Sequence, residues 1–227
     1  MNYNYNDIYN LLKKISFPKN FFCEETFFEH NPNIYTFSKN NFDIFTGCSK
    51  LVIAPKFADY VIKIPFNGFF QGIEEDFTLF ERAFDDPDDL EAWDYCAKEV
   101  YIYNLSKIYF AETINPFAKT IFFDTINNWP VYLQEKCESF KSLSFKSPFS
   151  NEELSSTYHT LAEKCGSCCC MNSDWLTYYY KTYGLDKTSS LLEFLQYYEL
   201  EDFHSDNVGF SKKTHKLVLI DFSGFNE

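Results

Sequence analysis

The sequence predicts an α+β fold that begins with a five-stranded antiparallel sheet and continues into a mostly helical region. Two observations support the sheet: three short apolar, β-branched runs lie in residues 41–66, and two more flank a polar turn in residues 116–136. A third observation supports the helices, because apolar residues recur at helical spacing in residues 90–110 and 191–200. At 45% hydrophobic residues, the 227-residue chain also has enough apolar side chains for a sizeable core.

Residues 1–40 are expected to form an N-terminal extension with one helix at about residues 8–15. Three strands then follow as a meander, at residues 42–45, 51–54 and 60–65. An insert at residues 67–89 comes next and is longer than a simple loop.

A main helix is predicted at residues 90–110, because its apolar side chains lie at helical spacing. Two apolar segments, residues 116–123 and 131–136, should form a hairpin that completes the five-stranded sheet. These elements define a first structural region over residues 41–137.

Residues 138–227 should form the second region, which opens with a polar linker at 138–150. Helices are expected near residues 152–164, 175–183 and 191–200. A β-hairpin made of residues 208–210 and 216–220 should close the region.

Three polar side chains lie beside this last hairpin. Asp202 follows the helix at 191–200, Asn207 precedes the first strand, and Asp221 ends the second strand. Transfer of a γ-phosphoryl group requires metal ions on the phosphate oxygens and a group that orients the attacking hydroxyl. Mg²⁺ prefers oxygen ligands, usually one or two carboxylates together with phosphates. The spacing therefore suits a phosphoryl-transfer site.

These residues resemble motifs of the protein-kinase superfamily. Residues 202–207 look like the catalytic loop D-x-x-x-x-N, and residues 220–224 look like the D-F-G segment with one serine inserted. The resemblance implies a two-lobed, kinase-like fold that binds ATP and Mg²⁺. It also implies that Asp202 is the catalytic base and that Asn207 and Asp221 hold the metal.

Lys63 fits the same resemblance, because it interrupts a β-branched strand where a lysine is costly unless it is paired. In kinases a lysine at this place contacts the α- and β-phosphates, and the segment here is Val61-Ile62-Lys63. The alternative is an outward-facing lysine on an alternating strand.

A phosphate-binding lysine of this kind needs a carboxylate on a nearby helix. Glu99 lies beside the apolar stripe of the helix at 90–110 and is the first choice, with Glu91 and Asp94 as rivals. A solvent-exposed helix charge is the alternative interpretation of Glu99.

By position, backbone groups of Glu135 and Cys137 would hold the adenine of ATP, although both residues could simply end a strand. Kinases place several glycines between their first two strands, and this chain has only Gly47 there. Backbone N–H groups, Ser49 and Lys50 could compensate at the phosphates.

The formal net charge of −13 argues against a nucleic-acid backbone binder, which would carry basic patches. No run reaches the roughly 18 apolar residues of a membrane span. The N-terminus is polar, so we expect no signal peptide and a cytoplasmic location, or delivery into a host cytoplasm. Without export, the eight cysteines are expected as free thiols, and a metal site in residues 165–170 is the lesser alternative.

The resemblance covers about residues 42–224, and the chain is similar to minimal kinases found among secreted bacterial effectors and phage-like proteins, which end near this segment. It implies a kinase without an activation loop that phosphorylates a hydroxyl of a protein substrate, with an unidentified protein partner. Two alternatives stay open. One is a catalytically weak pseudokinase that acts as a binding module, and the other is an AMP transferase or small-molecule phosphotransferase.

Overall fold

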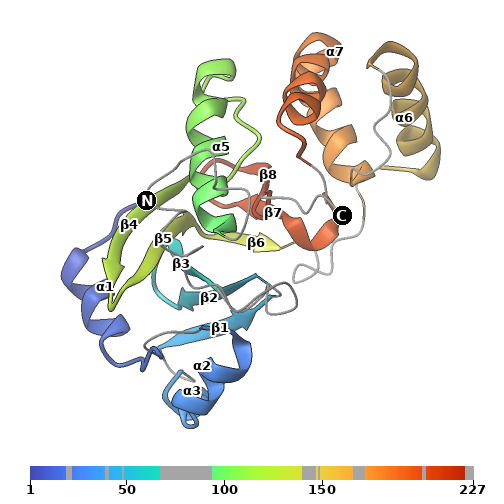
Figure 1. Ribbon diagram of the computed structural model, residues 1–227. Coiled ribbons are helices and arrows are strands. Elements are labelled where there is room, and N and C mark those ends of the chain that lie inside the picture. The colour runs from blue at the N-terminus through green and yellow to red at the C-terminus, as the bar shows by residue number, and fades with distance from the viewer. Residues whose placement is uncertain are drawn as a thin grey trace, which may run out of the picture. The chain divides into compact units, whose positions relative to one another are not determined.

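The computed structural model describes residues 1–18, 22–38, 41–47, 49–66, 94–139, 147, 149–165, 172–200 and 203–222. Over these residues the chain is α+β, with six α-helices and two antiparallel sheets (Figure 1). It divides into two compact units. Unit 1 comprises Met1–Ile102 and Lys119–Lys136, and unit 2 comprises Tyr103–Ala118 and Cys137–Glu227.

The five-stranded antiparallel sheet predicted from the sequence is confirmed and lies in unit 1. Its strands have the spatial order β1-β2-β3-β5-β4. Their bounds are β1 Phe42–Thr46, β2 Lys50–Pro55, β3 Tyr60–Pro65, β4 Thr120–Ile126 and β5 Trp129–Glu135. The β4–β5 turn consists of Asn127 and Asn128, with φ of 54° and 67°. Asparagine tolerates this left-handed conformation, which suits a two-residue hairpin turn.

One face of this sheet is apolar, because side chains alternate between the two faces of each strand. Leu51 and Ile53 of β2 lie opposite Ile64 and Ile62 of β3, and Leu133 of β5 lies opposite Ile62. All five side chains are fully buried.

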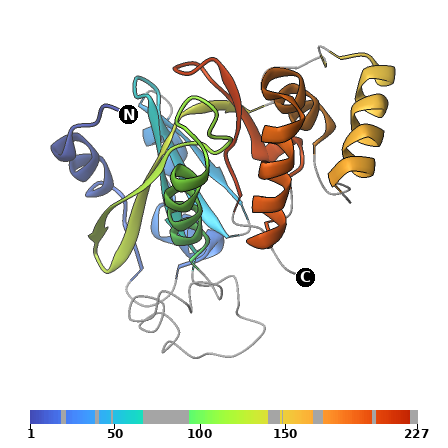
Figure 2. The same cartoon turned by 90° about the horizontal axis from the view of Figure 1, so that it is seen from above.

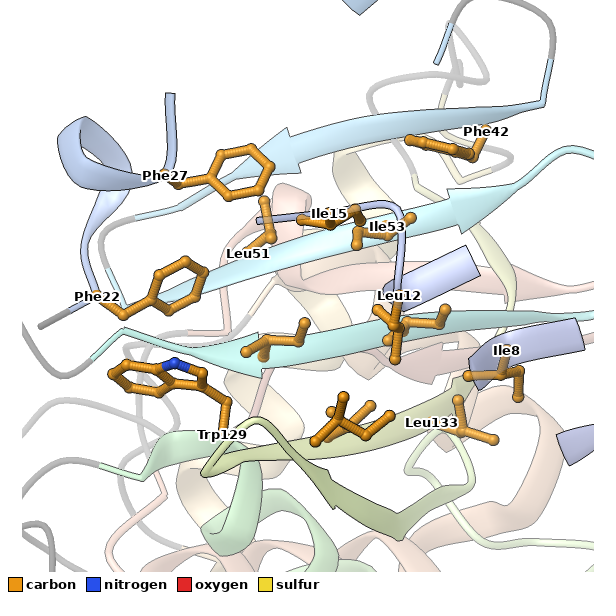
Figure 3. Packing of buried hydrophobic residues seen from close by; sticks show 14 of the residues in the cluster. Ile8, Leu12, Ile15, Phe22, Phe27, Phe42, Leu51, Ile53, Trp129 and Leu133 are labelled. Carbon is orange, nitrogen blue, oxygen red and sulfur yellow. The ribbon is translucent and has the colours of Figure 1, made fainter. Parts of the chain in front are cut away.

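The N-terminal segment covers this apolar face (Figure 3). It contains α1 (Tyr5–Leu12), α2 (Glu24–His30) and α3 (Ile34–Ser38). The buried residues that it adds to the cluster are Ile8, Leu12, Ile15, Phe22, Phe27 and Ile34. The residues that the sequence analysis set apart as an extension thus help to build the core of unit 1.

Two local details position this segment. The Asn4 side chain accepts a hydrogen bond from the N–H of Asn6, so α1 begins three residues earlier than predicted. The indole N–H of Trp129 donates to the carbonyl oxygen of Pro18 at 3.1 Å, and the Trp129 ring lies against Phe22. The hairpin β4–β5 is therefore attached directly to the N-terminal segment.

The helix predicted at residues 90–110 is α5 (Tyr95–Tyr109), and its residues are divided between the two units. Asp94 Oδ1 accepts a hydrogen bond from the N–H of Ala97 at 2.9 Å and so caps the start of the helix. The predicted insert at residues 67–89 lies outside the described residues.

Unit 2 contains a three-stranded antiparallel sheet in the order β6-β7-β8. The strands are β6 (Cys137–Ser139), β7 (Val208–Ser211) and β8 (Lys216–Leu219), and the short 3₁₀-helix η2 (Ser205–Asn207) precedes β7. The predicted hairpin corresponds to β7 and β8. Gly209 of β7 must be small, since a Cβ there would lie 2.8 Å from Cys137 Cβ and 2.9 Å from a methyl carbon of Ile220.

One predicted strand is corrected in this region. Residues 116–123 do not form one strand, because residues 116–118 bond to β8 instead of continuing β4. The N–H of Leu219 donates to Pro116, and the N–H of Ala118 donates to Leu219, both at 2.8 Å. Phe117 also packs on Phe222 with ring centroids 4.8 Å apart.

The helices of unit 2 include α6 (Asn151–Cys165) and α7 (Ser173–Tyr197), which lie side by side in Figure 2. Helix α7 joins the two helices predicted at 175–183 and 191–200. It is interrupted at Gly184, whose φ of 81° is not helical. Among the described residues, we find no helix with both the length and the apolar character that a membrane crossing requires.

Candidate functional site

The centre of the candidate site in unit 1 is a buried ion pair between Lys63 and Glu99. Lys63 is the fourth residue of β3, and its side chain is on the face opposite the apolar cluster, while Glu99 is in the second turn of α5. The Lys63 Nζ donates to Glu99 Oε2 at 2.7 Å and to Oε1 at 2.9 Å. Glu99 is fully buried and Lys63 is 4% exposed. The structure therefore joins the lysine and the glutamate that the sequence analysis selected.

Lys50 is bonded to the same carboxylate. Its Nζ donates to Glu99 Oε1 at 2.6 Å, and only 3% of Lys50 is exposed. Lys50 begins β2 and lies opposite Pro65 of β3, two residues from Lys63 on the same face of the sheet. Two ammonium groups on neighbouring strands thus share one acceptor oxygen.

A neutral hydrogen-bond chain holds Glu99 from β5 and β4. Gln134 Nε2 donates to Glu99 Oε2 at 3.2 Å and to Thr120 Oγ1 at 2.9 Å. Both residues are buried, and the register places them opposite each other on adjacent strands. The carboxylate is therefore fixed by donors from three strands.

Asp94, one of the rivals to Glu99, has a different partner. The Tyr132 hydroxyl donates a hydrogen bond to Asp94 Oδ2 at 2.5 Å. Burial raises the pKa of Asp94 to about 6, and the bonds from Tyr132, Ala97 and Cys96 oppose this rise only in part. Burial also raises the pKa of the Cys96 thiol. Glu91, the other rival, lies outside the described residues.

In unit 2, Asn207 and Asp221 lie at the same end of the β7–β8 hairpin. Val208 pairs with Leu219, so Asn207 immediately precedes β7 where Ile220 and Asp221 follow β8. The N–H of Ile220 donates to the carbonyl oxygen of Asn207 at 2.8 Å. Both side chains are partly exposed. The hairpin thus brings the backbones of the two predicted metal ligands to the same end of β7 and β8.

The segments beside these residues are fixed by aromatic packing. Phe203 and Phe222 are buried; Phe203 lies against Trp175, and Phe222 against Phe117. His204 accepts a hydrogen bond at Nδ1 from the N–H of Asp206 at 3.1 Å and thereby caps η2. Asp202, the predicted catalytic base, lies outside the described residues.

The β1–β2 connection contains the predicted phosphate-contacting residues. The N–H of Gly47 donates to the carbonyl oxygen of Lys50 at 3.0 Å, and Ser49 accepts from the N–H of Phe66 at 2.8 Å. Among the described residues, a Cβ added at Gly47 would meet only the Lys50 carbonyl oxygen, at 4.0 Å. The local packing therefore does not itself demand glycine at position 47.

The residues predicted to hold adenine belong to different units. The N–H of Glu135, at the end of β5, donates to the carbonyl oxygen of Lys119 at 2.8 Å and is therefore already used within the sheet. Cys137 begins β6 in unit 2 and is paired with Ser211.

Comparison with known proteins finds no matching family model, no matching curated protein and no matching solved structure. The chemistry of the site is therefore argued from its own residues.

Unit 1 offers two buried ammonium groups on a fixed carboxylate, which suit the binding of an anion such as phosphate. Unit 2 offers one carboxylate and one amide oxygen, which are ligands that Mg²⁺ accepts when phosphates complete its shell. Among the described residues, no group of three or more His, Cys, Asp or Glu side chains could hold a metal by itself. The two oxygen donors of unit 2 would therefore need further ligands, such as phosphate oxygens, to complete the shell of a metal.

Sequence reasoning did not identify Gln134, Thr120 or the bond from Lys50 to Glu99. The strand alternation carries this information once the register is known, because Lys50, Lys63 and Gln134 then occupy one face. A strand register follows from turn geometry and packing, which the sequence alone left open.

Proposed function

We propose that the protein is a phosphotransferase with a kinase-like, two-lobed fold, which uses ATP and Mg²⁺ to phosphorylate a hydroxyl group of a protein substrate. The observation that carries the proposal is the buried bond between Lys63 of β3 and Glu99 of α5. A lysine held in this way by a helix glutamate is the arrangement that protein kinases use to contact the α- and β-phosphates.

The energetic argument supports a functional role for this pair. Burying a lysine and a glutamate removes both from water, and replacing such a pair with apolar side chains is often neutral or stabilising. Stability therefore gives little reason to place Lys50, Lys63 and Glu99 inside unit 1. A requirement for fixed positive charge gives a direct reason to bury them, since phosphate oxygens accept hydrogen bonds from ammonium groups.

Each residue has a separate task in the proposed reaction. Lys63 binds phosphate oxygens, and Glu99 keeps the Lys63 ammonium in one position. Asn207 and Asp221 would hold Mg²⁺, which when bound neutralises charge on the phosphates. Asp202 would orient the substrate hydroxyl and accept its proton.

The decisive experiment is Mg²⁺-dependent ATP turnover, measured as release of ADP and as phosphate incorporated into the protein or an added protein substrate. We expect Lys63→Met and Asp221→Ala to lower turnover by at least about a hundredfold, because each removes a charge that acts on the phosphates. Lys56→Met is the matched control. Lys56 lies in unit 1 and is exposed, and its Nζ lies 3.9 Å from Asp43 Oδ1 on the surface.

Turnover that Asp221→Ala leaves unchanged would reject the assignment. Mass analysis of the products separates phosphorylation from AMP transfer and from phosphorylation of a small molecule, which give different mass changes.

A pseudokinase that acts as a binding module is the second candidate. It is favoured by the single glycine of the β1–β2 connection, which provides fewer close backbone contacts to a triphosphate. Thermal denaturation with and without ATP and Mg²⁺ distinguishes the two, because a ligand that binds the folded state raises its apparent stability. An unchanged melting temperature at millimolar ATP would favour the binding module.

A further inference from the structure

We propose that Lys50 is a second phosphate-binding lysine, which acts with Lys63 on the polyphosphate of a nucleoside di- or triphosphate. This inference rests on the proposed function, since it names the ligand chemistry of the same site. It is carried by the geometry at Glu99, where the two ammonium groups donate to one carboxylate oxygen at 2.6 Å and 2.9 Å.

The sheet register explains how the two lysines reach the same point. Lys63 lies opposite Val52, and Lys50 lies opposite Pro65. Both lysines are therefore on the face of the sheet from which Glu99 is contacted, on adjacent strands and displaced by two residues. A diagonal pair of this kind is within reach of long side chains.

The charges at this point favour a polyphosphate. Glu99 carries one negative charge and accepts from two positive groups that are nearly inaccessible to water. Two like charges repel more strongly when buried than in water, and a multiply charged anion relieves that repulsion. A di- or triphosphate can accept from both ammonium groups through different phosphoryl oxygens, whereas a neutral ligand gains nothing from either.

The position of Lys50 links this role to the β1–β2 connection. Lys50 is the first residue of β2, and its carbonyl oxygen accepts from the N–H of Gly47. A glycine-rich loop would offer several backbone N–H groups to a phosphate. Here a side-chain ammonium fixed by Glu99 supplies a full positive charge from the end of the same connection.

The test compares affinities for ATP, ADP and adenosine, measured by isothermal titration calorimetry on the full chain in EDTA. Lys50→Met should weaken ATP and ADP binding by about tenfold, which is the usual loss for a hydrogen bond to a charged group. Adenosine affinity should not change, because adenosine has no phosphate. The dissociation constant of tripolyphosphate alone should also rise by about tenfold in Lys50→Met.

Two further variants keep the result interpretable. Lys50→Gln retains a donor for Glu99 but no charge, and it replaces Lys50→Met if that variant shows no cooperative melting. Lys56→Met removes a surface lysine of the same unit and should leave all affinities unchanged. A purely structural role for Lys50 would weaken adenosine and ATP binding alike, and this result would overturn the inference.

The outcomes also separate this inference from the proposed function. If the wild type binds ATP and Lys63→Met weakens binding, but Lys50→Met and Lys50→Gln bind ATP like the wild type, Lys50 is not a phosphate ligand and the proposed function stands. If the wild type binds neither ATP nor tripolyphosphate, the proposed function fails and the inference fails with it.

Discussion

The two faces of the five-stranded sheet in unit 1 differ in almost every respect. One face is lined by aliphatic side chains and covered by the N-terminal segment, with Leu51, Ile53, Ile62 and Leu133 fully buried. The other face is almost as inaccessible to water, yet its buried residues each carry a polar group that is bonded to another side chain. They are Lys50, Lys63, Tyr132 and Gln134.

The difference between the two faces shows that one sheet can provide stability on one side and position reactive groups on the other. Burial of aliphatic side chains stabilises the fold by about 25 cal/mol for each Å² removed from water. Burial of charged and polar side chains gives little net stability even when every group is bonded. The apolar face therefore supplies stability, and the polar face holds its side chains in fixed positions at the expense of some of that stability.

Removal of the Glu99 charge should have the largest effect. Glu99→Gln leaves two buried ammonium groups around a neutral amide, so we expect the free energy of unfolding in urea to fall by about 3–5 kcal/mol. The control is Asp43→Asn, which removes a carboxylate from an exposed ion pair and should have little effect. A loss below about 1 kcal/mol for Glu99→Gln would show that the polar face does not depend on this charge.

Truncation of a side chain on the apolar face should have the next largest effect on the free energy of unfolding. Leu51→Ala deletes a fully buried side chain beneath the N-terminal segment and should lower the free energy of unfolding by about 3 kcal/mol. Binding of ATP to the folded protein should be unchanged, since the alanine faces away from Lys50 and Lys63. Calorimetry at a temperature where the variant is folded checks this, and weaker ATP binding would contradict the separation of the two faces.

Measuring stability against pH should reveal the raised pKa of Asp94, which is bonded to Tyr132 on the polar face. Its pKa is raised from 3.8 to about 6, so between these pH values the folded protein keeps a proton that the unfolded chain has released. The contribution of Asp94 to the free energy of unfolding is therefore fully present below pH 4. It is lost as the pH rises through 6, by about 3 kcal/mol in all.

Asp94→Asn cannot titrate and provides the comparison. The difference in unfolding free energy between wild type and variant should decline from pH 4 to pH 6 and then level off. A difference that stays flat over this interval would mean that Asp94 titrates alike in the folded and unfolded states.

Replacement of the whole ion cluster should have the smallest effect on stability. The triple variant Lys50→Met, Lys63→Met and Glu99→Leu exchanges three charged side chains for apolar ones of similar size. Its free energy of unfolding should be within about 1 kcal/mol of the wild type, or higher. ATP binding should be lost. A large loss of stability would instead assign the cluster a structural role.

The strands were predictable because each is a short apolar run between turn residues. The expected β3 at residues 60–65 agrees with the structure to the residue, and β1 and β2 agree to within one residue at each end. Strand β6 was not predicted, since three residues in a polar stretch carry no periodic signal and become a strand only by pairing with β7.

The role of the N-terminal segment was also missed. Phe22 and Phe27 lie in a short stretch that is rich in phenylalanine but has no long helical pattern, and they are buried because the sheet offers an apolar face. Tertiary packing of this kind cannot be read from local spacing.

In the candidate site, Lys63 was predictable because an isolated lysine in a β-branched strand requires a partner. The carboxylate that pairs with Lys63 could be narrowed only to three candidates, because helical spacing does not fix which side of α5 meets the sheet. Lys50 was assigned to the phosphate loop from its position after Gly47 and Ser49. Its bond to Glu99 depends on the β2–β3 register and could not be foreseen.

The hydrogen bond between Trp129 and Pro18 joins residues that are 111 positions apart. A ribosome that adds about 5–20 residues per second completes Trp129 on the order of ten seconds after Pro18. Throughout that interval Phe22 can reach Phe66 but lacks the Trp129 ring that completes its surroundings. Closure of the apolar face over the N-terminal segment is therefore a late event of synthesis.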